Sequence, residues 1–188
     1  MGKIHLVYGG SGSGKSEYAE NLSVRLQKED TTSGDATLWY VATMYPYDMD
    51  GQIDEEVKHR IARHRMQRSD KGMMTVECYL DFEKLDAKAE DVVLLECTSN
   101  LLANILYRSE KKPKNPTQHI LSMLQKLSLQ VRHLIVVSND VFSDGIGLCQ
   151  DEETFRYAKA LADIHRWLAK EATTVTEVCC GIPIFIKE

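Results

Sequence analysis

Residues 9–16 read Gly-Gly-Ser-Gly-Ser-Gly-Lys-Ser and come directly after the apolar run at residues 4–8. A glycine, four free positions and then Gly-Lys-Ser form the P-loop pattern, whose glycines let backbone N–H groups converge on a phosphate chain. A helical pattern starts right behind the motif, so the phosphates would also meet the positive end of a helix. This position between strand and helix favours a nucleotide site over an accidental Gly/Ser-rich turn.

The pattern assigns an expected part to each residue of the motif. The backbone would surround the phosphates, the lysine would add a point charge near the terminal phosphates, and the last serine would offer its hydroxyl to Mg²⁺. The residues concerned are Gly9, Gly10, Ser11, Gly12, Ser13, Gly14, Lys15 and Ser16.

Size and composition favour a single globular domain over residues 1–188, with 43% hydrophobic and 27% charged residues. No apolar run approaches the roughly 20 residues that span a bilayer, and the N-terminus lacks a signal-peptide pattern, so we expect a cytoplasmic location. A net charge of −5 argues against nucleic acid as a partner, although basic residues gather at 58–71. The five cysteines show no C-x-x-C spacing, and we expect them to be reduced and buried.

Strand and helix patterns alternate along the chain. Strands are predicted at residues 4–8, 37–43, 73–79, 91–97, 133–139, 174–180 and 182–187, and helices at 15–27, 54–68, 98–109, 117–130 and 152–170. This order predicts an α/β fold, a doubly wound, mostly parallel sheet like that of P-loop NTPases, which closes with a C-terminal β-hairpin. Ligands of such folds bind beyond the carboxyl ends of the strands, so the P-loop, Thr43, Glu96 and Asn139 should lie along one edge.

Phosphoryl and nucleotidyl transfer need Mg²⁺, and a P-loop protein usually supplies an acidic residue from a second strand to hold it. Glu96, at the end of Val-Val-Leu-Leu, is the best candidate, and Asp140 is the second. Either carboxylate has a structural alternative, as a helix cap or a solvated strand end.

The helix at 54–68 carries an unusual histidine. Ile53, Val57 and Ile61 form an apolar stripe at spacings of four, and His64 continues near it, between Arg60 and Arg68. By spacing alone such a histidine is a structural residue. The surrounding arginines, which could bind phosphates, raise the case for a nucleophile that attacks phosphorus, whereas His59 is expected to be a polar surface residue.

Seven segments in order along the chain resemble those of one enzyme family. They are residues 9–16, Trp-Tyr-Val-Ala-Thr at 39–43, Arg60-Ile-x-x-His64-Arg65-x-x-Arg68, Thr-Val-Glu77, Leu-Leu-Glu96-Cys97, Ser-Asn-Asp140 and Cys-Gly-Ile-Pro at 180–183. The chain thereby resembles the bifunctional adenosylcobinamide kinase/adenosylcobinamide-phosphate guanylyltransferases of cobalamin biosynthesis. The P-loop is generic, whereas the arginine and histidine motif is much more specific.

The resemblance implies a two-part function. His64 would take GMP from GTP as a covalent phosphoramidate, releasing pyrophosphate, and pass it to the corrinoid phosphate to give adenosylcobinamide-GDP. The same enzyme would phosphorylate adenosylcobinamide with ATP or GTP, with Lys15 on the phosphates and Mg²⁺ held by Ser16 and Glu96. The family also implies a homotrimer. Beyond the P-loop, the residues that the resemblance assigns to nucleotide binding are Thr43, Met44, Tyr45, Arg65, Met66, Gln67, Arg68, Glu77 and Glu96.

Two segments depart from the family pattern. Ser69 stands where the family usually has proline, which would loosen the turn behind the histidine helix. Residues 141–148 read Val-Phe-Ser-Asp-Gly-Ile-Gly-Leu, with one extra residue and no proline, where the family tends to have Val-Gly-x-Gly-Ile-Val-Pro. We expect this change to affect corrinoid binding or the kinase half, since it replaces a flexible glycine with phenylalanine.

Three other readings stay open at this stage. The chain could be a P-loop kinase of another small acceptor with His64 merely structural, or a non-catalytic relative that binds GTP. A GTP-dependent switch is less favoured, because no Asn-Lys-x-Asp motif follows the buried strands.

Overall fold

The computed structural model describes residues 2–29, 36–47, 51–143 and 151–188. Seven strands form one sheet in the order β3-β2-β4-β5-β1-β6-β7, parallel throughout except for the final antiparallel pair. The strands are β1 (Lys3–Gly9), β2 (Leu38–Ala42), β3 (Met74–Glu77), β4 (Val92–Glu96), β5 (His133–Asn139), β6 (Thr174–Cys179) and β7 (Ile182–Lys187). The predicted doubly wound sheet with its C-terminal hairpin is confirmed.

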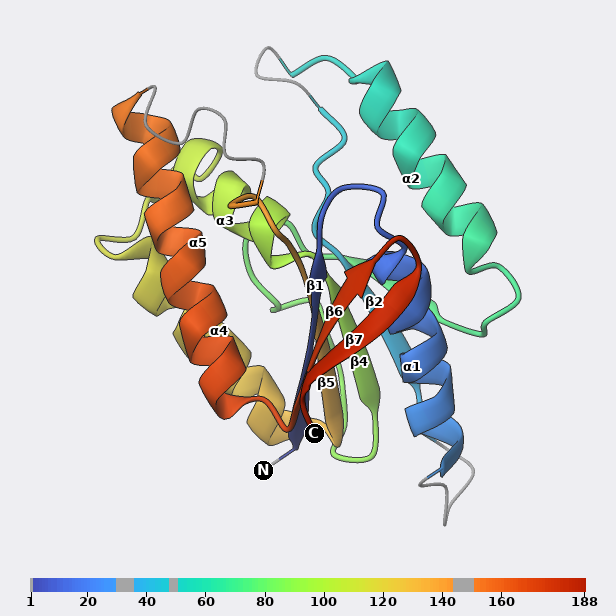
Figure 1. The fold of residues 1–188 in the computed structure, drawn as a ribbon. Helices are drawn as coiled ribbons and strands as arrows, with labels where there is room; N and C mark the ends of the chain where they lie inside the picture. Colours follow the sequence, from blue (N-terminus) through green and yellow to red (C-terminus); the bar gives the residue numbers. More distant parts are fainter. Residues whose placement is uncertain (1, 30–35, 48–50, 144–150) are drawn as a thin grey trace.

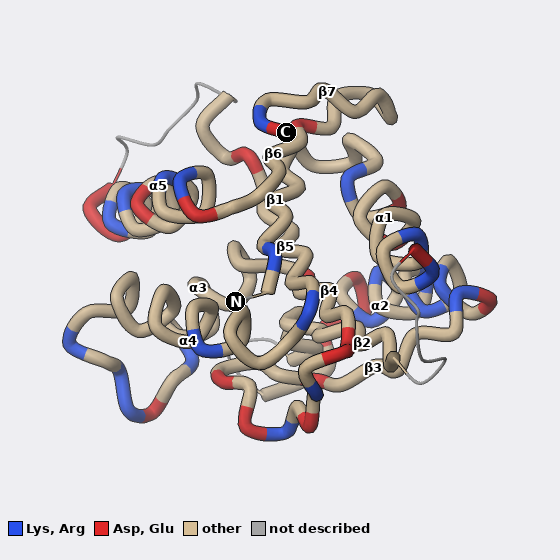
Figure 2. The backbone as a smooth tube through the Cα atoms, turned by 90° about the horizontal axis from the view of Figure 1, so that it is seen from below, with Lys and Arg blue, Asp and Glu red and all other residues tan. Residues whose placement is uncertain are grey.

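Helices cover both faces of the sheet (Figures 1 and 2). They are α1 (Lys15–Glu29), α2 (Glu55–Gln67), α3 (Thr98–Tyr107), α4 (Pro116–Gln130) and α5 (Glu152–Glu171). Helix α1 lies on one face, α3, α4 and α5 lie on the other, and α2 stands beyond the upper edge on the α1 side. Both termini lie at the opposite edge.

The central strands β4 and β5 are buried on both faces, as their continuous apolar sequences require. One face forms the larger core with α3, α4 and α5, in which Leu101, Leu124 and Leu161 are completely buried. The other face packs against α1 through Ala19 and Leu22. The sheet is therefore a rigid base whose upper edge can hold side chains in fixed positions.

The strand register brings the predicted polar residues to that edge. Gly9 pairs with Asn139, and Glu96 pairs with both Ala42 and Val137, so β1, β2, β4 and β5 end at one level. Because parallel strands share a direction, the segments that follow them all leave on the same side.

The predicted element boundaries hold to within a few residues at each end. The burial of the cysteines was predicted correctly for Cys78 and Cys97 and wrongly for Cys179 and Cys180. The last two are exposed because they enter the β6–β7 turn, where Cys180 has a φ of 50°. Cys149 lies outside the described residues. None of the helices in the described part of the chain is long and apolar enough to cross a membrane.

Two histidines meet inside the sheet near its lower edge. His5 on β1 and His133 on β5 pair with 3.0 Å between Nε2 and Nδ1, and the His5 Nδ1 lies 2.9 Å from the Thr174 hydroxyl. Burial, helped by the positive charges of His133 and Lys3, lowers the pKa of His5 from 6.5 to about 4. The folded protein therefore binds a proton at His5 less readily than the unfolded chain does.

This pKa shift predicts a loss of stability in mild acid. Between pH 6.5 and pH 4 the unfolded chain binds the extra proton, so the free energy of unfolding should fall by about 3 kcal/mol as pH falls across this window. Denaturant titrations at several pH values would measure it. His5→Gln should flatten the slope, whereas His119→Gln on the exposed face of α4 should leave it unchanged. An equally steep slope in His5→Gln would contradict the assignment.

Candidate nucleotide site

The P-loop curls between β1 and α1 through glycines that no other residue replaces easily. Gly12 and Gly14 have φ values of 70° and 90°, in the left-handed region. A Cβ on Gly9 would come within 2.4 Å of the Val178 carbonyl oxygen. The β6–β7 turn packs directly on the loop, where the Gly181 N–H donates to the Ser13 carbonyl at 2.8 Å. The loop is thus held in its curled form from the side as well as by its own sequence.

Lys15 is buried at the first turn of α1, with 7% of its surface exposed. Its Nζ donates to the Gly10 carbonyl at 2.9 Å, across the mouth of the loop. Burial lowers the pKa of this ammonium group. An anion that entered the loop would gain a partly desolvated charge, which is worth more than an exposed one.

Ser16 and Glu96 come together as predicted. The Ser16 hydroxyl donates to Glu96 Oε1, and the Tyr40 hydroxyl donates to Glu96 Oε2 at 3.1 Å. A serine hydroxyl and a carboxylate beside a phosphate loop are ligands that suit Mg²⁺. In the described residues no group of three or more His, Cys, Asp or Glu could hold a metal by itself. A magnesium ion here would therefore take further ligands from the phosphates and water.

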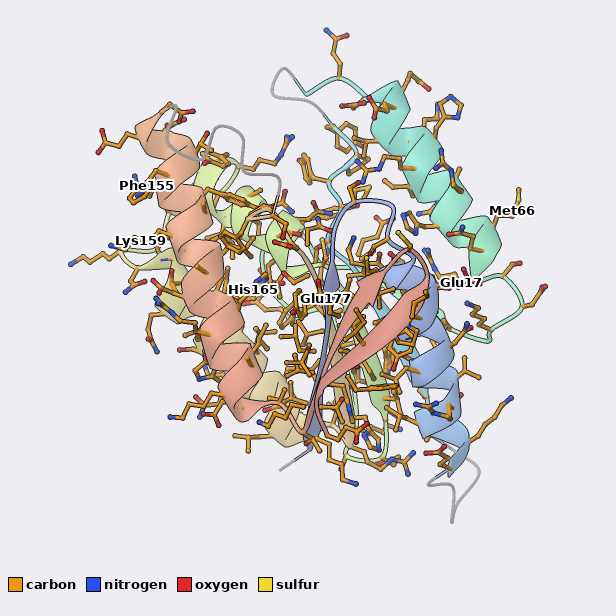
Figure 3. All side chains as sticks on the ribbon, viewed as in Figure 1. Glu17, Met66, Phe155, Lys159, His165 and Glu177 are labelled. Carbon is orange, nitrogen blue, oxygen red and sulfur yellow. The ribbon has the colours of Figure 1, made fainter. Side chains whose placement is uncertain are left out.

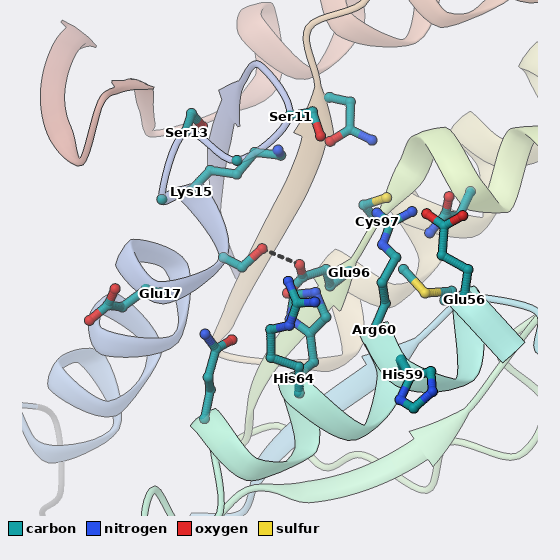
Figure 4. A pocket seen from close by; sticks show the side chains of 18 residues that line it. Ser11, Ser13, Lys15, Glu17, Glu56, His59, Arg60, His64, Glu96 and Cys97 are labelled. Carbon is teal, nitrogen blue, oxygen red and sulfur yellow. Dashed lines mark hydrogen bonds between the residues drawn. The ribbon is translucent and has the colours of Figure 1, made fainter.

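A large cavity of about 790 Å³ opens above the loop, between the sheet edge and α2 (Figure 4). It is lined by residues 11–17 and by Met44, Glu56, His59, Arg60, Arg63, His64, Gln67, Glu96, Cys97, Asn100 and Asn139. His64 and Arg60 project from α2 toward Glu96. Four cationic or imidazole side chains of α2 thus share one cavity with Lys15, a charge pattern that favours a polyphosphate ligand.

Helix α2 has a capped start and a narrow, half-buried apolar face. Asp54 caps its start by accepting from the Val57 N–H at 3.1 Å, and Glu55 and Glu56 occupy its first turn, as the helix dipole prefers. Val57, Ile61 and His64 are half-buried and form its inner face, although no residue of α2 itself is fully buried. The apolar stripe from which the helix was predicted thus lies on the same face as His64, and this face looks toward the P-loop.

His64 lies where two cavities meet. A second cavity of about 30 Å³ shares Met44, His64 and Glu96 with the first and continues under α2 toward β3. His64 Nδ1 is buried and has no hydrogen-bond partner within the described part of the chain. A buried polar atom without a partner is rare in a folded protein, and it marks a place where a ligand or water completes the site.

Besides the shared Met44 and Glu96, the second cavity is lined by three more of the predicted nucleotide-binding residues. Arg68 is 6% exposed, and its guanidinium lies 3.9 Å from the centre of the Tyr40 ring. Arg65 forms an ion pair with Glu77 at 2.7 Å, and Glu77 also accepts from the Tyr79 hydroxyl at 2.8 Å. Arg65, Arg68 and Glu77 therefore line one small recess next to His64.

Other predicted residues lie elsewhere. Thr43 is completely buried, and its hydroxyl accepts from the Cys97 N–H at 2.7 Å and donates to the Cys97 carbonyl at 2.9 Å. Tyr45 packs against Tyr79, and Met66 is 79% exposed and points away from both cavities (Figure 3). Their contacts with nucleotide stay predictions that this geometry does not support. Asp140 caps its own turn by accepting from the Phe142 N–H at 2.9 Å, so Glu96 is the better candidate for a metal ligand.

Sequence reasoning missed Tyr40, Glu56 and Asn100. Tyr40 reaches Glu96 because β2 and β4 pair in register, and that pairing leaves no local signal in the sequence. Asn100 lies in the first turn of α3, the helix that directly follows the strand ending at Glu96, and this position at the predicted edge could have suggested it. His59, expected to be a plain surface residue, is exposed yet lines the main cavity.

The structure describes one of the two departures from the family pattern in full and the other in part. Ser69 does not loosen its turn, because its hydroxyl donates to the Met66 carbonyl at 2.9 Å and its N–H donates there at 3.3 Å. In the segment 141–148, residues 144–148 lie outside the described residues. Phe142 packs edge-on against His165, with ring centroids 5.8 Å apart.

The fold and the loop together define a nucleotide-binding protein of the P-loop NTPase class. Within this class, the family described as cobinamide kinase / cobinamide phosphate guanyltransferase matches residues 5–186. The chain belongs to this family, as the motifs in the sequence predict, and membership supports a transferase.

Two relatives agree with this assignment. The bifunctional adenosylcobalamin biosynthesis protein CobU of Escherichia coli K12 is 30% identical, with 97% of this chain and 98% of that protein covered. The protein of the same name from Salmonella typhimurium LT2 is 28% identical with the same coverage. A solved structure, the flagellar accessory protein FlaH from Methanocaldococcus jannaschii, is similar at a TM-score of 0.46 and 12% identity, covering 98% of this chain and 78% of that one.

The position of Lys15 predicts its effect on nucleotide binding. Lys15→Met removes a buried positive charge from the phosphate loop, so the dissociation constant for a nucleoside triphosphate should rise about 10- to 100-fold. Isothermal titration calorimetry would measure it, with Lys28→Met, an exposed lysine near the far end of α1, as the matched control. Unchanged affinity in Lys15→Met would contradict the placement of phosphates in the loop.

Proposed function

We propose that this protein acts in adenosylcobalamin biosynthesis as a bifunctional transferase. It phosphorylates adenosylcobinamide and then transfers GMP from GTP to adenosylcobinamide phosphate, giving adenosylcobinamide-GDP and pyrophosphate. Family membership and the two bifunctional relatives support the pathway. The site residues support the chemistry of each step.

One observation carries the proposal. His64 faces the same cavity as Lys15 and Ser16, and its Nδ1 is buried without a hydrogen-bond partner in the described chain. A merely structural histidine on an α/β scaffold is normally satisfied, as His165 is by Ser138 at 2.6 Å. An unsatisfied imidazole opposite a phosphate loop favours a nucleophile.

The guanylyl transfer then proceeds by two displacements. A ring nitrogen of His64 attacks the α-phosphorus of GTP; a nitrogen–phosphorus bond forms, the bond to the bridging oxygen breaks, and pyrophosphate leaves. The proton on the other ring nitrogen is released. An oxygen of adenosylcobinamide phosphate next attacks the same phosphorus, which breaks the nitrogen–phosphorus bond and returns the proton to the imidazole.

Charges around the cavity match the changes in these steps. Lys15, Arg60 and Arg63 line it and would stabilise the negative charge that gathers on the pyrophosphate. Ser16 and Glu96 would hold Mg²⁺, which neutralises phosphate charge when it is bound. In the recess under α2, the Glu77 carboxylate can accept from N–H groups of a guanine, and Arg65 and Arg68 can hold the nucleotide beside His64.

The kinase step uses the same loop. The hydroxyl of adenosylcobinamide attacks the γ-phosphorus of ATP or GTP, the bond to the nucleoside diphosphate breaks, and the hydroxyl proton is released. Lys15 would neutralise the transferred group. The homotrimer that the resemblance implies stays a prediction.

The proposal predicts a covalent intermediate on His64. With Mg²⁺ and GTP labelled at the α-phosphate, the denatured protein should retain acid-labile, alkali-stable label, whereas GTP labelled at the γ-phosphate should leave none. His64→Ala should reduce the α-label at least 10²-fold, because the nitrogen that forms the bond is gone. Scintillation counting of the denatured protein measures both.

His59→Ala is the matched control, since His59 lies on the same helix and lines the same cavity. It should keep the label. Label that survives in His64→Ala would disprove the assigned nucleophile. Absence of α-label on the wild type, with GTP still bound, would instead favour a kinase of another small acceptor or a non-catalytic relative.

A further inference from the structure

The helix that carries His64 has few attachments to the rest of the protein. No residue of α2 is buried, and the helix stands apart from the sheet in Figure 1. At its start, the Asp54 N–H donates to the Pro46 carbonyl at 3.1 Å. At its end, Arg68 lies on Tyr40 and donates to the Thr75 hydroxyl at 3.3 Å. Further contacts must help to fix the position of α2, because a helix whose inner face is only half-buried gains little from packing.

A buried ion pair just beyond the helix provides this attachment. Lys71 Nζ lies 2.6 Å from Glu20 Oε2, and the Glu20 side chain is 1% exposed while that of Lys71 is 20% exposed. The other ion pairs of α1 and α2 described here are more exposed. The side chains of Arg25–Glu29 and Lys58–Glu55 are about 60% exposed. Those of Arg65–Glu77, which joins α2 to β3 at 2.7 Å, are 58% and 46% exposed. Exposed pairs contribute little to stability, whereas breaking a buried pair leaves a costly unpaired charge.

Glu20 occupies a particular position on α1. It follows Ser16 by four residues, so the two side chains lie on one face of the same helix, one turn apart. Ser16 donates to Glu96 at the phosphate loop, and Glu20 holds Lys71 at the end of the histidine helix. A single rigid face of α1 is thus bonded both to the metal-binding edge and to the arm that bears the histidine.

We propose that the Glu20–Lys71 pair is a positioning device that sets the distance and orientation of His64 relative to the phosphate loop. Neither residue lines the main cavity, so neither touches the nucleotide there. The proposal rests on the proposed function for its kinetic consequence, and on geometry alone for its structural one. It assigns a role in the guanylyl transfer to residues that the motifs do not contain.

The buried surroundings of Glu20 require a positively charged partner. Its second oxygen, Oε1, is buried without a hydrogen-bond partner in the described chain, and burial raises the pKa of this carboxyl group while Lys71 opposes the rise. Arg68 adds a second positive charge nearby. Loss of Lys71 would leave a desolvated carboxylate at the base of α2, and the end of the helix would move to admit water.

The kinetic test compares Lys71→Met with the wild type at saturating GTP. The rate of covalent labelling of His64 should fall about 10²-fold, as expected for a nucleophile displaced by about 1 Å, while GTP affinity stays within about threefold. Lys71→Arg, which keeps the charge, should restore most of the rate. Glu29→Gln, which breaks the exposed pair on α1, is the matched control and should behave like the wild type.

A structural readout works without any catalysis. Nitroxide labels on cysteines introduced at Asn21 and Ala62, both exposed, report the distance between α1 and α2 by pulsed electron resonance. The native cysteines Cys149, Cys179 and Cys180 are first replaced by serine. The distance distribution should be narrow with Lys71 present and should broaden or shift in Lys71→Met.

The two readouts separate the two hypotheses. A broadened distance with slow labelling supports the positioning role, whereas an unchanged distance or a normal labelling rate in Lys71→Met overturns it. If the wild type takes no label at all, the proposed function fails, and the distance measurement alone decides whether the pair positions α2.

Discussion

The hydrogen bond between Ser16 and Glu96 joins the phosphate loop to strand β4 in the middle of the sheet. Ser16 belongs to the helix that follows the phosphate loop, and Glu96 ends a strand in the middle of the sheet. This bond forms because the strand that leads into Ser16 and the strand that ends with Glu96 finish at one level of the sheet. It also requires that α1 packs on the sheet face against β4. The fold thereby brings together a hydroxyl and a carboxylate that are 80 residues apart.

Around this fixed edge the protein adds a less constrained element. The α2 helix contributes Arg60, Arg63 and His64 to the main cavity, yet it has no buried residue of its own. A helix so rich in charge cannot be anchored by hydrophobic burial, since its long polar side chains would lose their hydration. It is held by individual contacts instead: the Asp54 N–H on the Pro46 carbonyl, Arg65 on Glu77, Arg68 on Tyr40, and Lys71 on Glu20. Such contacts allow a cationic surface to face the phosphate loop while its position stays defined.

Much of the site could be predicted where a local pattern carried the information. The P-loop follows from glycine spacing, and Glu96 from its place at the end of a buried apolar run. The helical stripe predicted only the element that carries His64, whose role was suggested by the arginines around it and by the family resemblance. Thr43 shows the opposite case, since it follows β2 at the correct edge but turns into the protein to bond the backbone of Cys97. Met66 lies beside the histidine motif in sequence and on the outer face of the helix in space. Position in the sequence therefore predicts the secondary-structure element and the sheet edge at which a residue lies, but not the direction in which its side chain points.

The sequence by itself determined the fold class, the phosphate loop and the helix that bears the histidine, because glycine conformation and hydrophobic periodicity act over a few residues. The tertiary structure alone decided that Tyr40 bonds to Glu96, that His64 faces two joined cavities, and that Glu20 pairs with Lys71. These contacts depend on strand register and on the packing of α1, which arise from burial summed over the whole sheet. No short segment of the sequence carries a signal for these long-range contacts. They determine the side-chain positions that periodicity only suggests.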